Sequence, residues 1–354
     1  MGALKNILRH TVTYPRLTDW VTKLLPPSVT IFMLHRLAVP ELGVEGIATD
    51  HLRNCLDYLQ KNNYRFISIE DAVRRALANQ LGKEKWVAFS LDDGFEEQVR
   101  LGAEIFQEFD CPVTCFLVTD FVDGKLWPWD YKLMHLARTA TAQTIHVVID
   151  DASHTIEMGR DDTEAFLLRF ARQIAPESVT HAVQLIATQA GVDIPEMPPP
   201  EMQPTTWHAV REAEKKGMRF GPHSASHFIL ARTRDATLQD EIKSSSRRIR
   251  QECAQPAEVF CYPSGKVDEF DDRAIAAVRA QGLLGAVSAE PGYLEQSTIQ
   301  QSDNYRFVLP RLPLPDNRAE FTLYVSWAQR VRERLAHTPL QQFYTSTTAR
   351  IALQ

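Results

Sequence analysis

Cysteine is scarce in this chain. The 354 residues include five cysteines, an odd number, and their positions show no zinc-knuckle spacing. Cys111 and Cys115 lie around a predicted strand, where a free thiol usually serves as a small core residue. This usage is typical of a protein in a reducing compartment. The cysteines are Cys55, Cys111, Cys115, Cys253 and Cys261.

An excess of positive charge and long apolar segments are also missing. The net charge is −6 and the pI is about 6.0, which argues against a nucleic-acid partner, since such binding rests on clustered basic residues. The apolar run Val29–Leu34 is too short to span a membrane. The N-terminus, interrupted by Lys5, Arg9 and Arg16, has no secretory signal. We therefore expect a cytoplasmic protein.

Peripheral contact with the cytosolic face of a membrane stays open at this point. The segment Leu8–Leu25 is weakly amphipathic, and we expect a helix that docks on its own domain rather than a membrane anchor. The oligomeric state does not follow from the sequence.

What the chain does have is an alternation of β-rich and helical segments. Hydrophobic residues make up 44 % of the chain and charged residues 24 %, as in folded globular proteins. Strands alternating with helices predict parallel βα units and an α/β fold. Strands are predicted at 29–34, 66–69, 86–93, 112–118, 218–220, 258–262 and 284–288. Helices are predicted at 52–59, 71–80, 96–109, 163–174, 178–190, 207–216, 238–253, 272–280 and 324–335.

Polar clusters follow several of these strands at their carboxyl ends. They are His35, Asp92-Asp93, the His223/His227 pair and the segment Pro263–Gly265. In a closed parallel barrel all strand C-termini open on one face, where active sites are built, whereas a doubly wound sheet would spread them along an edge. We favour the barrel.

The chain divides by texture into a main domain, an insertion and two ends. We expect an N-terminal extension at 1–27, a barrel over 28–316 and a C-terminal helical tail at 317–354. At about 137–204 the sequence pattern changes to helical stretches, followed by a proline-rich segment, and it contains no cluster of potential catalytic or metal-binding residues. We interpret this stretch as a helical cap inserted into the barrel, with Trp127–Asp130 before it in a loop.

The chain is organised around a strand that ends in Asp92, Asp93 and Gly94. Neighbouring side chains on a strand point to opposite faces, so one carboxylate could bind a metal while the other remains free as a base. His223 and His227 are four positions apart, which brings two imidazoles together if a turn of helix begins there. Two histidines and an aspartate suit zinc or a similar divalent ion.

These motifs, in this order, resemble the polysaccharide deacetylases, the NodB-type or family-4 carbohydrate esterases. Ser90–Gly94 corresponds to the family's T-F-D-D-G motif, and His223–His227 to its H-[ST]-x-x-x-H motif. Phe260–Gly265 matches the F-A-Y-P-Y-G form of the third motif, and Met33–Arg36 resembles the M-Y-H-R segment that opens many bacterial members. The resemblance spans roughly Ile31 to Pro315.

The resemblance implies a distorted parallel (β/α)7 barrel and a set of site roles. Asp92 is then the general base, while Asp93, His223 and His227 hold a divalent ion, zinc foremost, with Co²⁺, Ni²⁺, Fe²⁺ or Mn²⁺ as other candidates. The backbone N–H of Ser264 would help to form the oxyanion hole. The implied substrate is an N-acetylated amino sugar, and the products are a free amine and acetate.

The sequence departs from the family pattern twice. Many members carry, in the third motif, an arginine that orients the base, and Cys261 occupies that position. Arg311 could substitute for it or serve packing. The late L-x-H motif with the general-acid histidine is missing, and Leu312–Pro315 lies near its place. In related subgroups the N-terminal histidine is the acid, so we assign this role to His35, against the alternative of a buried structural histidine.

Substrate contacts are predicted beside these groups. Trp127, Trp129 and Asp130 could stack on and hydrogen-bond a sugar ring, or the tryptophans could form a hydrophobic plug. Pro263 and Arg311 complete the substrate-binding candidates.

We therefore expect a metal-dependent N-deacetylase of an amino sugar in cell-envelope or exopolysaccharide synthesis. The substrate would be a polysaccharide, a lipid-linked glycan or a sugar precursor. One alternative is a deformylase or cyclic-amide hydrolase of the same superfamily. Another, from a different class, is an inactive barrel that binds glycans or scaffolds a synthesis complex.

Overall fold

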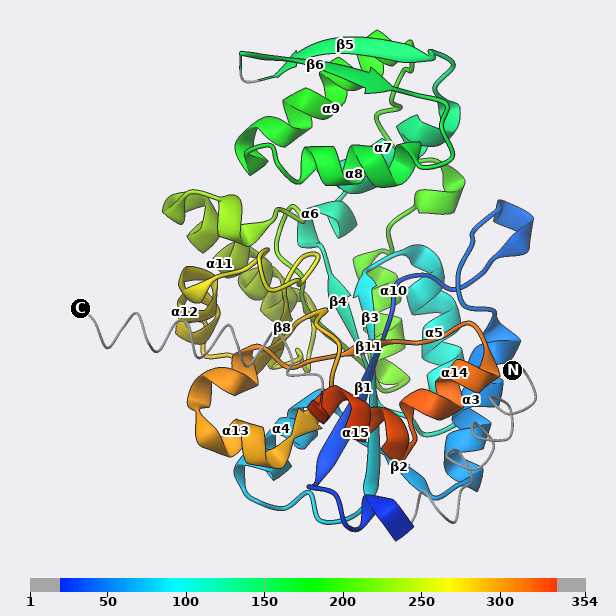
Figure 1. Cartoon of the computed structure of the whole chain (residues 1–354), viewed down its shortest axis with the longest axis vertical. Coiled ribbons are helices and arrows are strands. Elements are labelled where there is room, and N and C mark those ends of the chain that lie inside the picture. Colours follow the sequence, from blue (N-terminus) through cyan, green and yellow to red (C-terminus); the bar gives the residue numbers. More distant parts are fainter. Residues whose placement is uncertain (1–19, 150, 336–354) are drawn as a thin grey trace.

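The computed structural model describes residues 20–149 and 151–335 (Figure 1). Most of the segment Leu8–Leu25, the N-terminal extension before residue 20 and the tail after residue 335 lie outside this range. No helix of the described part is both long and apolar enough to cross a membrane.

A mostly parallel sheet forms the centre of the molecule. Four parallel strands lie side by side in the order β1 (Ser28–Leu34), β3 (Lys85–Asp93), β4 (Val113–Leu117) and β7 (Met218–Pro222). Short strands extend it. Strand β2 (Tyr64–Phe66) pairs with β3, β10 (Leu294–Glu295) pairs antiparallel with β1, and β11 (Leu312–Pro313) pairs with β1.

A second pair of parallel strands continues the sheet from β7 back towards β1. Strands β8 (Val259–Cys261) and β9 (Gly285–Val287) pair with each other, and the N–H of Ala257, just before β8, donates to Phe220 O of β7 at 2.7 Å. Val287 of β9 forms a parallel bridge to Leu309, from which the chain runs directly into β11 beside β1. The predicted α/β fold, a distorted parallel barrel, is confirmed.

Helices cover the outside of the sheet. They are α3 (Thr49–Lys61), α4 (Ile69–Leu77), α5 (Glu96–Glu108), α6 (Thr119–Val122), α10 (Trp207–Lys215), α11 (Asp235–Glu252), α12 (Asp272–Ala280), α13 (Gln296–Gln301), α14 (Arg318–Tyr324) and α15 (Trp327–Leu335). Short 3₁₀ turns occur at Pro40–Leu42, Pro200–Met202, Leu230–Arg232 and Asp303–Phe307. The α-helices pack on the sheet through their apolar faces. In α3, for example, the buried residues follow the helical period; they are Leu52, Cys55, Leu56 and Leu59.

The helix after residue 317 belongs to the main core. Phe321 of α14 is fully buried, and its ring lies 5.5 Å from that of Phe32 in β1. The Tyr64 hydroxyl of β2 donates to Val325 O at 2.8 Å. The described part of the predicted tail is thus packed on the barrel.

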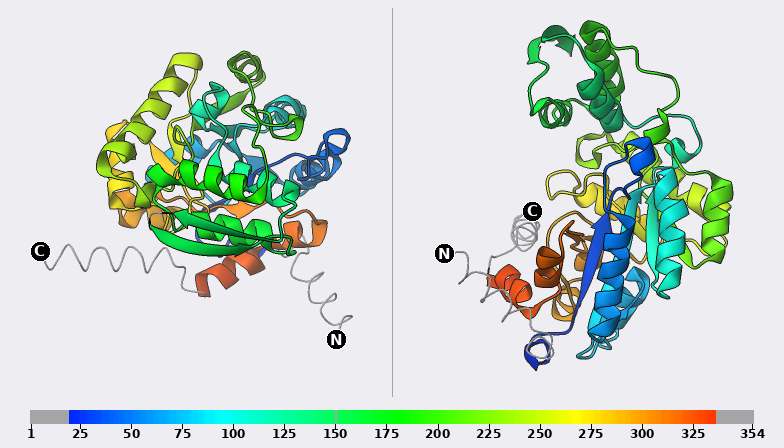
Figure 2. Two further views of the ribbon diagram at one scale, coloured as in Figure 1. Left: turned by 90° about the horizontal axis from the view of Figure 1, so that it is seen from above. Right: turned by 90° about the vertical axis from the view of Figure 1, so that its right-hand side faces the viewer.

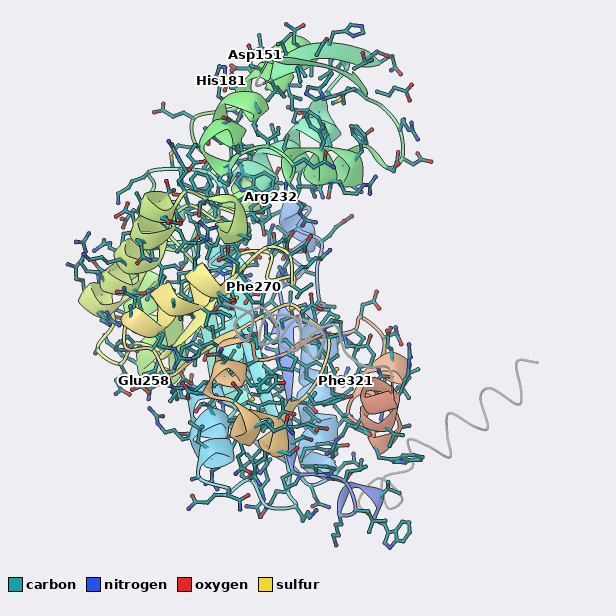
Figure 3. All side chains as sticks on the ribbon, turned by 60° about the vertical axis from the view of Figure 1, so that its left-hand side comes forward. Asp151, His181, Arg232, Glu258, Phe270 and Phe321 are labelled. Atoms are coloured by element: carbon teal, nitrogen blue, oxygen red, sulfur yellow. The ribbon has the colours of Figure 1, made fainter. Side chains whose placement is uncertain are left out.

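The insertion stands beyond the carboxyl ends of the strands (Figures 1 and 2). It contains α7 (Trp129–Thr139), α8 (Thr163–Ala171), α9 (Pro176–Ala190) and a hairpin of β5 (Thr144–Ile149) and β6 (Ala152–Glu157). Its buried side chains, such as Leu133 and Ile186, form a hydrophobic cluster that also includes Ile229 of the barrel. Figure 3 places Asp151 and His181 in this unit, away from Glu258 and Phe321 in the barrel.

The predicted helical stretches of the insertion are present as α8 and α9, but the hairpin was not predicted. Ile145, Val147 and Ile149 of β5 alternate with exposed residues and pack as a strand over α9. The predicted loop at Trp127–Asp130 is only partly a loop, because α7 begins at Trp129, directly after Pro128.

Candidate active site

The strand β3 ends in a sharp turn that presents its two aspartates differently. Asp93 and Gly94 are both left-handed, with φ of +88° and +90°. A side chain at Gly94 would meet Leu117 Cδ2 at 2.7 Å, so the turn requires glycine. The buried Gln98 side chain fixes it: its Oε1 accepts from the backbone N–H groups of Gly94 (3.0 Å) and Phe95 (2.9 Å).

Asp93 converges with both predicted histidines. Its Oδ1 lies 3.4 Å from His223 Nε2 and 3.4 Å from His227 Nε2. All three side chains are buried, with relative exposures of 2 %, 2 % and 6 %. Tetrahedral ligands that each lie about 2.1 Å from an ion are about 3.4 Å apart, so the spacing fits a shared metal ion.

The histidine pair lies in the predicted loop, and no turn of helix begins there. Ser224 and His227 are both left-handed, each with φ of +61°, and Ser224 Oγ accepts from His227 N–H at 3.0 Å. The Glu241 carboxylate of α11 accepts from the N–H groups of Ala225 (3.0 Å) and Ser226 (2.8 Å). The loop conformation directs both imidazoles towards Asp93.

Both imidazoles offer the same nitrogen to the centre. His223 Nδ1 lies 2.8 Å from Cys261 O, and since a carbonyl only accepts, Nδ1 carries the proton. His227 Nδ1 lies 2.9 Å from Asp130 Oδ2. The two Nε2 atoms are therefore left for a ligand. Such orientation of metal-binding histidines through the second nitrogen is typical of metal sites.

The charges of this group reinforce one another. Burial disfavours the ionised form of Asp93, but the hydrogen bond and charge of His223 and the charge of His227 outweigh it and lower its pKa. Burial likewise disfavours charged His227, yet the Asp130 and Asp93 carboxylates raise its pKa to about 9. The Asp93 carboxylate is therefore ionised in this group of side chains.

Asp92, one residue earlier, is held by an arginine instead. Arg311 Nη1 donates to Asp92 Oδ1 at 2.7 Å. Burial disfavours the Asp92 carboxylate, and the Arg311 and His223 charges outweigh it and lower the pKa. Arg311 has 1 % exposure and also donates to Ser288 O, at 2.7 Å, so it positions Asp92 rather than facing substrate. Its assignment to substrate binding is corrected accordingly.

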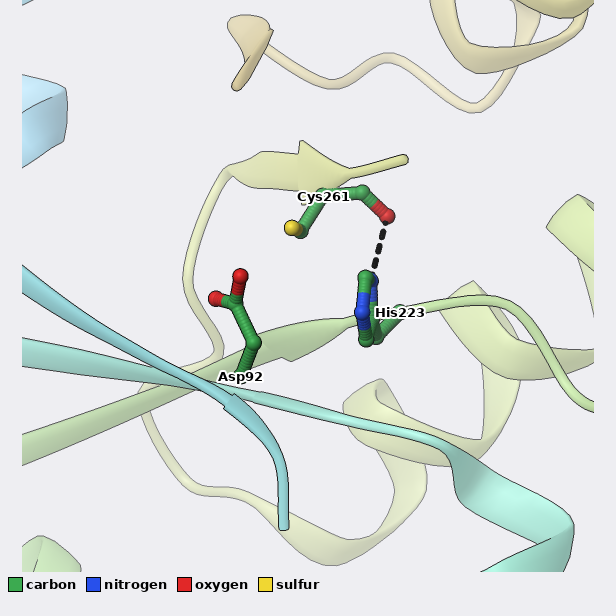
Figure 4. Close-up of side chains that lie close together, drawn as sticks. All are labelled: Asp92, His223 and Cys261. Carbon is green, nitrogen blue, oxygen red and sulfur yellow. Dashed lines mark hydrogen bonds between the residues drawn. The ribbon is translucent and has the colours of Figure 1, made fainter. Parts of the chain in front are cut away.

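A second set of potential ligands, Asp92, His223 and Cys261, lies beside the first (Figure 4). It is the poorer ion site for two reasons. Burial raises the pKa of the Cys261 thiol well above its usual value, so the sulfur stays protonated. Asp92 Oδ1 is occupied by Arg311, whose Nη2 also lies 3.3 Å from Cys261 Sγ.

His35 lies beside Asp92 on the same face. Leu34 of β1 is in register with Leu91 of β3, so His35 and Asp92 follow side by side at the two strand ends. The His35 side chain is exposed, unlike the buried structural histidine of the alternative. Burial opposes ionisation of the two aspartates, and the His35 charge is among those that lower the pKa of both.

The third motif forms a tight turn after β8. Ser264 and Gly265 are left-handed, with φ of +56° and +67°, and Pro263 is buried. A side chain at Gly265 would meet Ala289 N at 2.7 Å. Among the described residues, the Ser264 N–H has no hydrogen-bond acceptor, as an oxyanion donor requires.

The tryptophans before the insertion are not open to a sugar. Trp127 and Trp129 have exposures of 3 % and 5 %, and Trp129 Nε1 donates to His227 O at 3.0 Å. Their prediction as stacking platforms is corrected: they pack as the hydrophobic plug. Asp130, at 17 % side-chain exposure, faces His227.

Sequence reasoning missed two residues of this site. Gln98 lies one helical turn after the aspartates, a position where a capping side chain could have been suspected. Tyr131 donates through its hydroxyl to Asp93 Oδ2 at 2.5 Å, and it follows directly on the highlighted Trp-Asp pair. No local pattern links it to a strand 38 positions earlier.

Comparisons with known proteins place the fold and the family of this chain. The chain resembles the solved Streptococcus pyogenes deacetylase PplD in complex with acetate, at 16 % identity over 85 % of this chain and 99 % of that one, with a TM-score of 0.55. It also resembles IcaB from Ammonifex degensii, at 13 % identity over 86 % and 97 % of the two chains, with a TM-score of 0.55. At these identities the likeness shows the fold.

A comparison with curated protein sequences gave no significant match. A family model described as polysaccharide deacetylase matches residues 79–286, which include the aspartate pair, the histidine pair and the third motif. This chain therefore belongs to the polysaccharide deacetylase family and is a de-N-acetylating hydrolase.

Proposed function

We propose that the chain is a divalent-metal-dependent N-deacetylase of an amino sugar, with Asp93, His223 and His227 as metal ligands and Asp92 as the base. One observation carries the proposal. A buried carboxylate and two imidazole nitrogens, all oriented by second partners, meet at tetrahedral-ligand spacing directly beside a carboxylate that Arg311 keeps ionised. The residues fit the metal that the family implies.

A divalent ion held there supplies Lewis acidity, which polarises the amide carbonyl and lowers the pKa of water. Zinc is the foremost candidate, because two histidines, a carboxylate and an open position are its usual catalytic set. Co²⁺, Ni²⁺, Fe²⁺ and Mn²⁺ suit similar donors.

The chain's own groups divide the remaining work. Asp92, ionised and fixed by Arg311, takes a proton from the attacking water. The Ser264 N–H would donate a hydrogen bond to the oxygen on which negative charge develops. His35, exposed at the neighbouring strand end, gives a proton to the departing amine, which is a poor leaving group until protonated.

The substrate proposal is an N-acetylated amino sugar in a polysaccharide, a lipid-linked glycan or a precursor, within envelope or exopolysaccharide synthesis. The Streptococcus pyogenes neighbour is a deacetylase solved with acetate, the product that this reaction would release. All five cysteines are free and buried, which supports the predicted cytoplasmic location.

Product analysis on N-acetylated oligosaccharides tests the proposal. The zinc-reconstituted protein should release acetate and free amine, and the protein treated with a chelator should release neither. Formate from N-formyl sugars, without acetate from N-acetyl ones, would establish the deformylase alternative. Zinc binding without turnover of either class would favour the glycan-binding barrel.

A further inference from the structure

Consecutive residues at the start of α7 contact the proposed ion site. Trp129 Nε1 donates to His227 O at 3.0 Å, and Asp130 Oδ2 lies 2.9 Å from His227 Nδ1. The Tyr131 hydroxyl donates to Asp93 Oδ2 at 2.5 Å. The first turn of α7 thus contacts two of the three proposed ligands.

This turn is part of the insertion. Trp129 packs in the insertion's cluster with Leu133 and Leu136 of the same helix and with side chains of β5, β6, α8 and α9. Beyond Tyr131 the helix leads directly into the hairpin. The three contacts are therefore made where the insertion joins the barrel, since Trp129 packs with the insertion while the Tyr131 ring packs on Phe95, with ring centroids 4.7 Å apart.

Each contact fixes one degree of freedom of a ligand. Asp130 places its carboxylate 2.9 Å from His227 Nδ1 as an ion pair, while Nε2 of the same ring lies 3.4 Å from Asp93 Oδ1. Tyr131 occupies Asp93 Oδ2 and leaves Oδ1 towards the histidines. Trp129 anchors the backbone of His227, whose left-handed conformation needs such support.

We propose that Asp130 and Tyr131 are positioning residues of the metal centre, and that the insertion thereby sets the ion affinity of the barrel. The inference rests on the metal site of the proposed function. It assigns to the insertion a role in assembling the ion site, in addition to standing above the strand ends.

Conservative substitutions test the proposal by zinc affinity, measured by competition with a chromophoric chelator. Asp130→Asn and Tyr131→Phe keep the size of the side chains and should each weaken zinc binding about 10- to 100-fold. The matched controls are Tyr64→Phe, which removes a buried hydroxyl bond far from the site, and Asp271→Asn, at a helix N-cap that asparagine also fills. Both controls should bind zinc as the wild type does.

A spectroscopic readout separates positioning from a general loss of stability. In the Co²⁺-loaded protein, the visible absorption bands should change in Asp130→Asn and stay unchanged in both controls. Zinc should slow amide hydrogen exchange in α7 of the wild type and less so in Asp130→Asn.

Wild-type affinity and wild-type Co²⁺ spectra in both α7 variants would overturn the inference. If the wild type itself binds neither ion, the proposed function fails instead, so the two failures are distinguishable.

Discussion

Two adjacent aspartates of one strand are held by different parts of the molecule. Asp92 is bound by Arg311, which comes from the segment that closes the barrel back onto β1. Asp93 is bound by Tyr131, from the insertion beyond the strand ends. The comparison indicates that the base is stabilised within the barrel framework, whereas the ion ligand depends on the helix with which the insertion begins.

The two supports also differ in their energetics. The Asp92–Arg311 pair is buried on both sides, so removal of one partner leaves an uncompensated charge, a loss that typically costs about 3–5 kcal/mol. The Tyr131 hydroxyl is a neutral donor on a charged acceptor, a hydrogen bond worth about 1.5–3 kcal/mol. The barrel-side support should therefore be the costlier one to remove.

The largest expected effects come from neutralising each aspartate in turn. Asp92→Asn should lower turnover about 10²–10⁴-fold because the base is lost, and it should lower the melting temperature because Arg311 is left unpaired, while the zinc ligands and the zinc content stay unchanged. Asp93→Asn should lose zinc itself, since a ligand charge is removed. Metal analysis and acetate release on both purified variants check this, and equal metal loss in both would erase the division between the aspartates.

His35 tests whether the barrel side also supplies the acid. His35→Ala should reduce turnover about 10²–10⁴-fold, the usual contribution of a positioned proton donor. Because the side chain is exposed, the melting temperature and zinc content should stay near wild type. A near-normal rate would transfer the acid role to water or to another group.

Arg311→Lys keeps the charge beside Asp92 but loses the fork that also reaches Ser288 O and Ser90 Oγ. Arg311 holds the pKa of Asp92 below its usual range, so weaker pairing should raise that pKa. Since the base must be ionised, the acid limb of the kcat/KM profile should move to higher pH. Zinc affinity should not change. An unshifted limb would count against Arg311 as the residue that tunes the base.

Ile186→Ala gives the smallest effect on the site and isolates the insertion's core. Ile186 is fully buried there, and such a truncation typically costs about 2–5 kcal/mol of stability. Differential scanning calorimetry should show a lower melting temperature that zinc still raises, because the α7 contacts are intact. In Asp130→Asn the zinc-induced rise should shrink. Equal zinc responses in the two variants would indicate that the insertion acts through packing alone.

Local sequence patterns were sufficient for the strand ends that carry chemistry. Asp92-Asp93-Gly94 follows an apolar alternation, and His223 and His227 share one short loop, so both signals are contained within a few residues. The helix α12, at Asp272–Ala280, was predicted to the residue because its N-cap and apolar period coincide. The α/β alternation then gave the fold class.

The supports of the site could not be read in this way. Arg311 meets Asp92 across 219 positions, and Asp130 meets His227 only because an insertion folds back on the loop. Two tryptophans beside polar residues suggested a sugar platform, and only the packing shows them to be buried. The hairpin at β5 did leave a signal, the alternation of Ile145, Val147 and Ile149, which helical expectations for the insertion overrode.

The contact between Arg311 and Cys261 constrains how this site can evolve. The guanidinium reaches Asp92 through the space beside a small thiol, with Nη2 at 3.3 Å from the sulfur. An arginine at position 261 would need the same space, so the cation can come from position 261 or from position 311, but not from both. A single exchange at one position leaves Asp92 with two competing cations or with none. Positions 261 and 311 are therefore coupled in this chain, because a substitution at either one disturbs the pairing of Asp92.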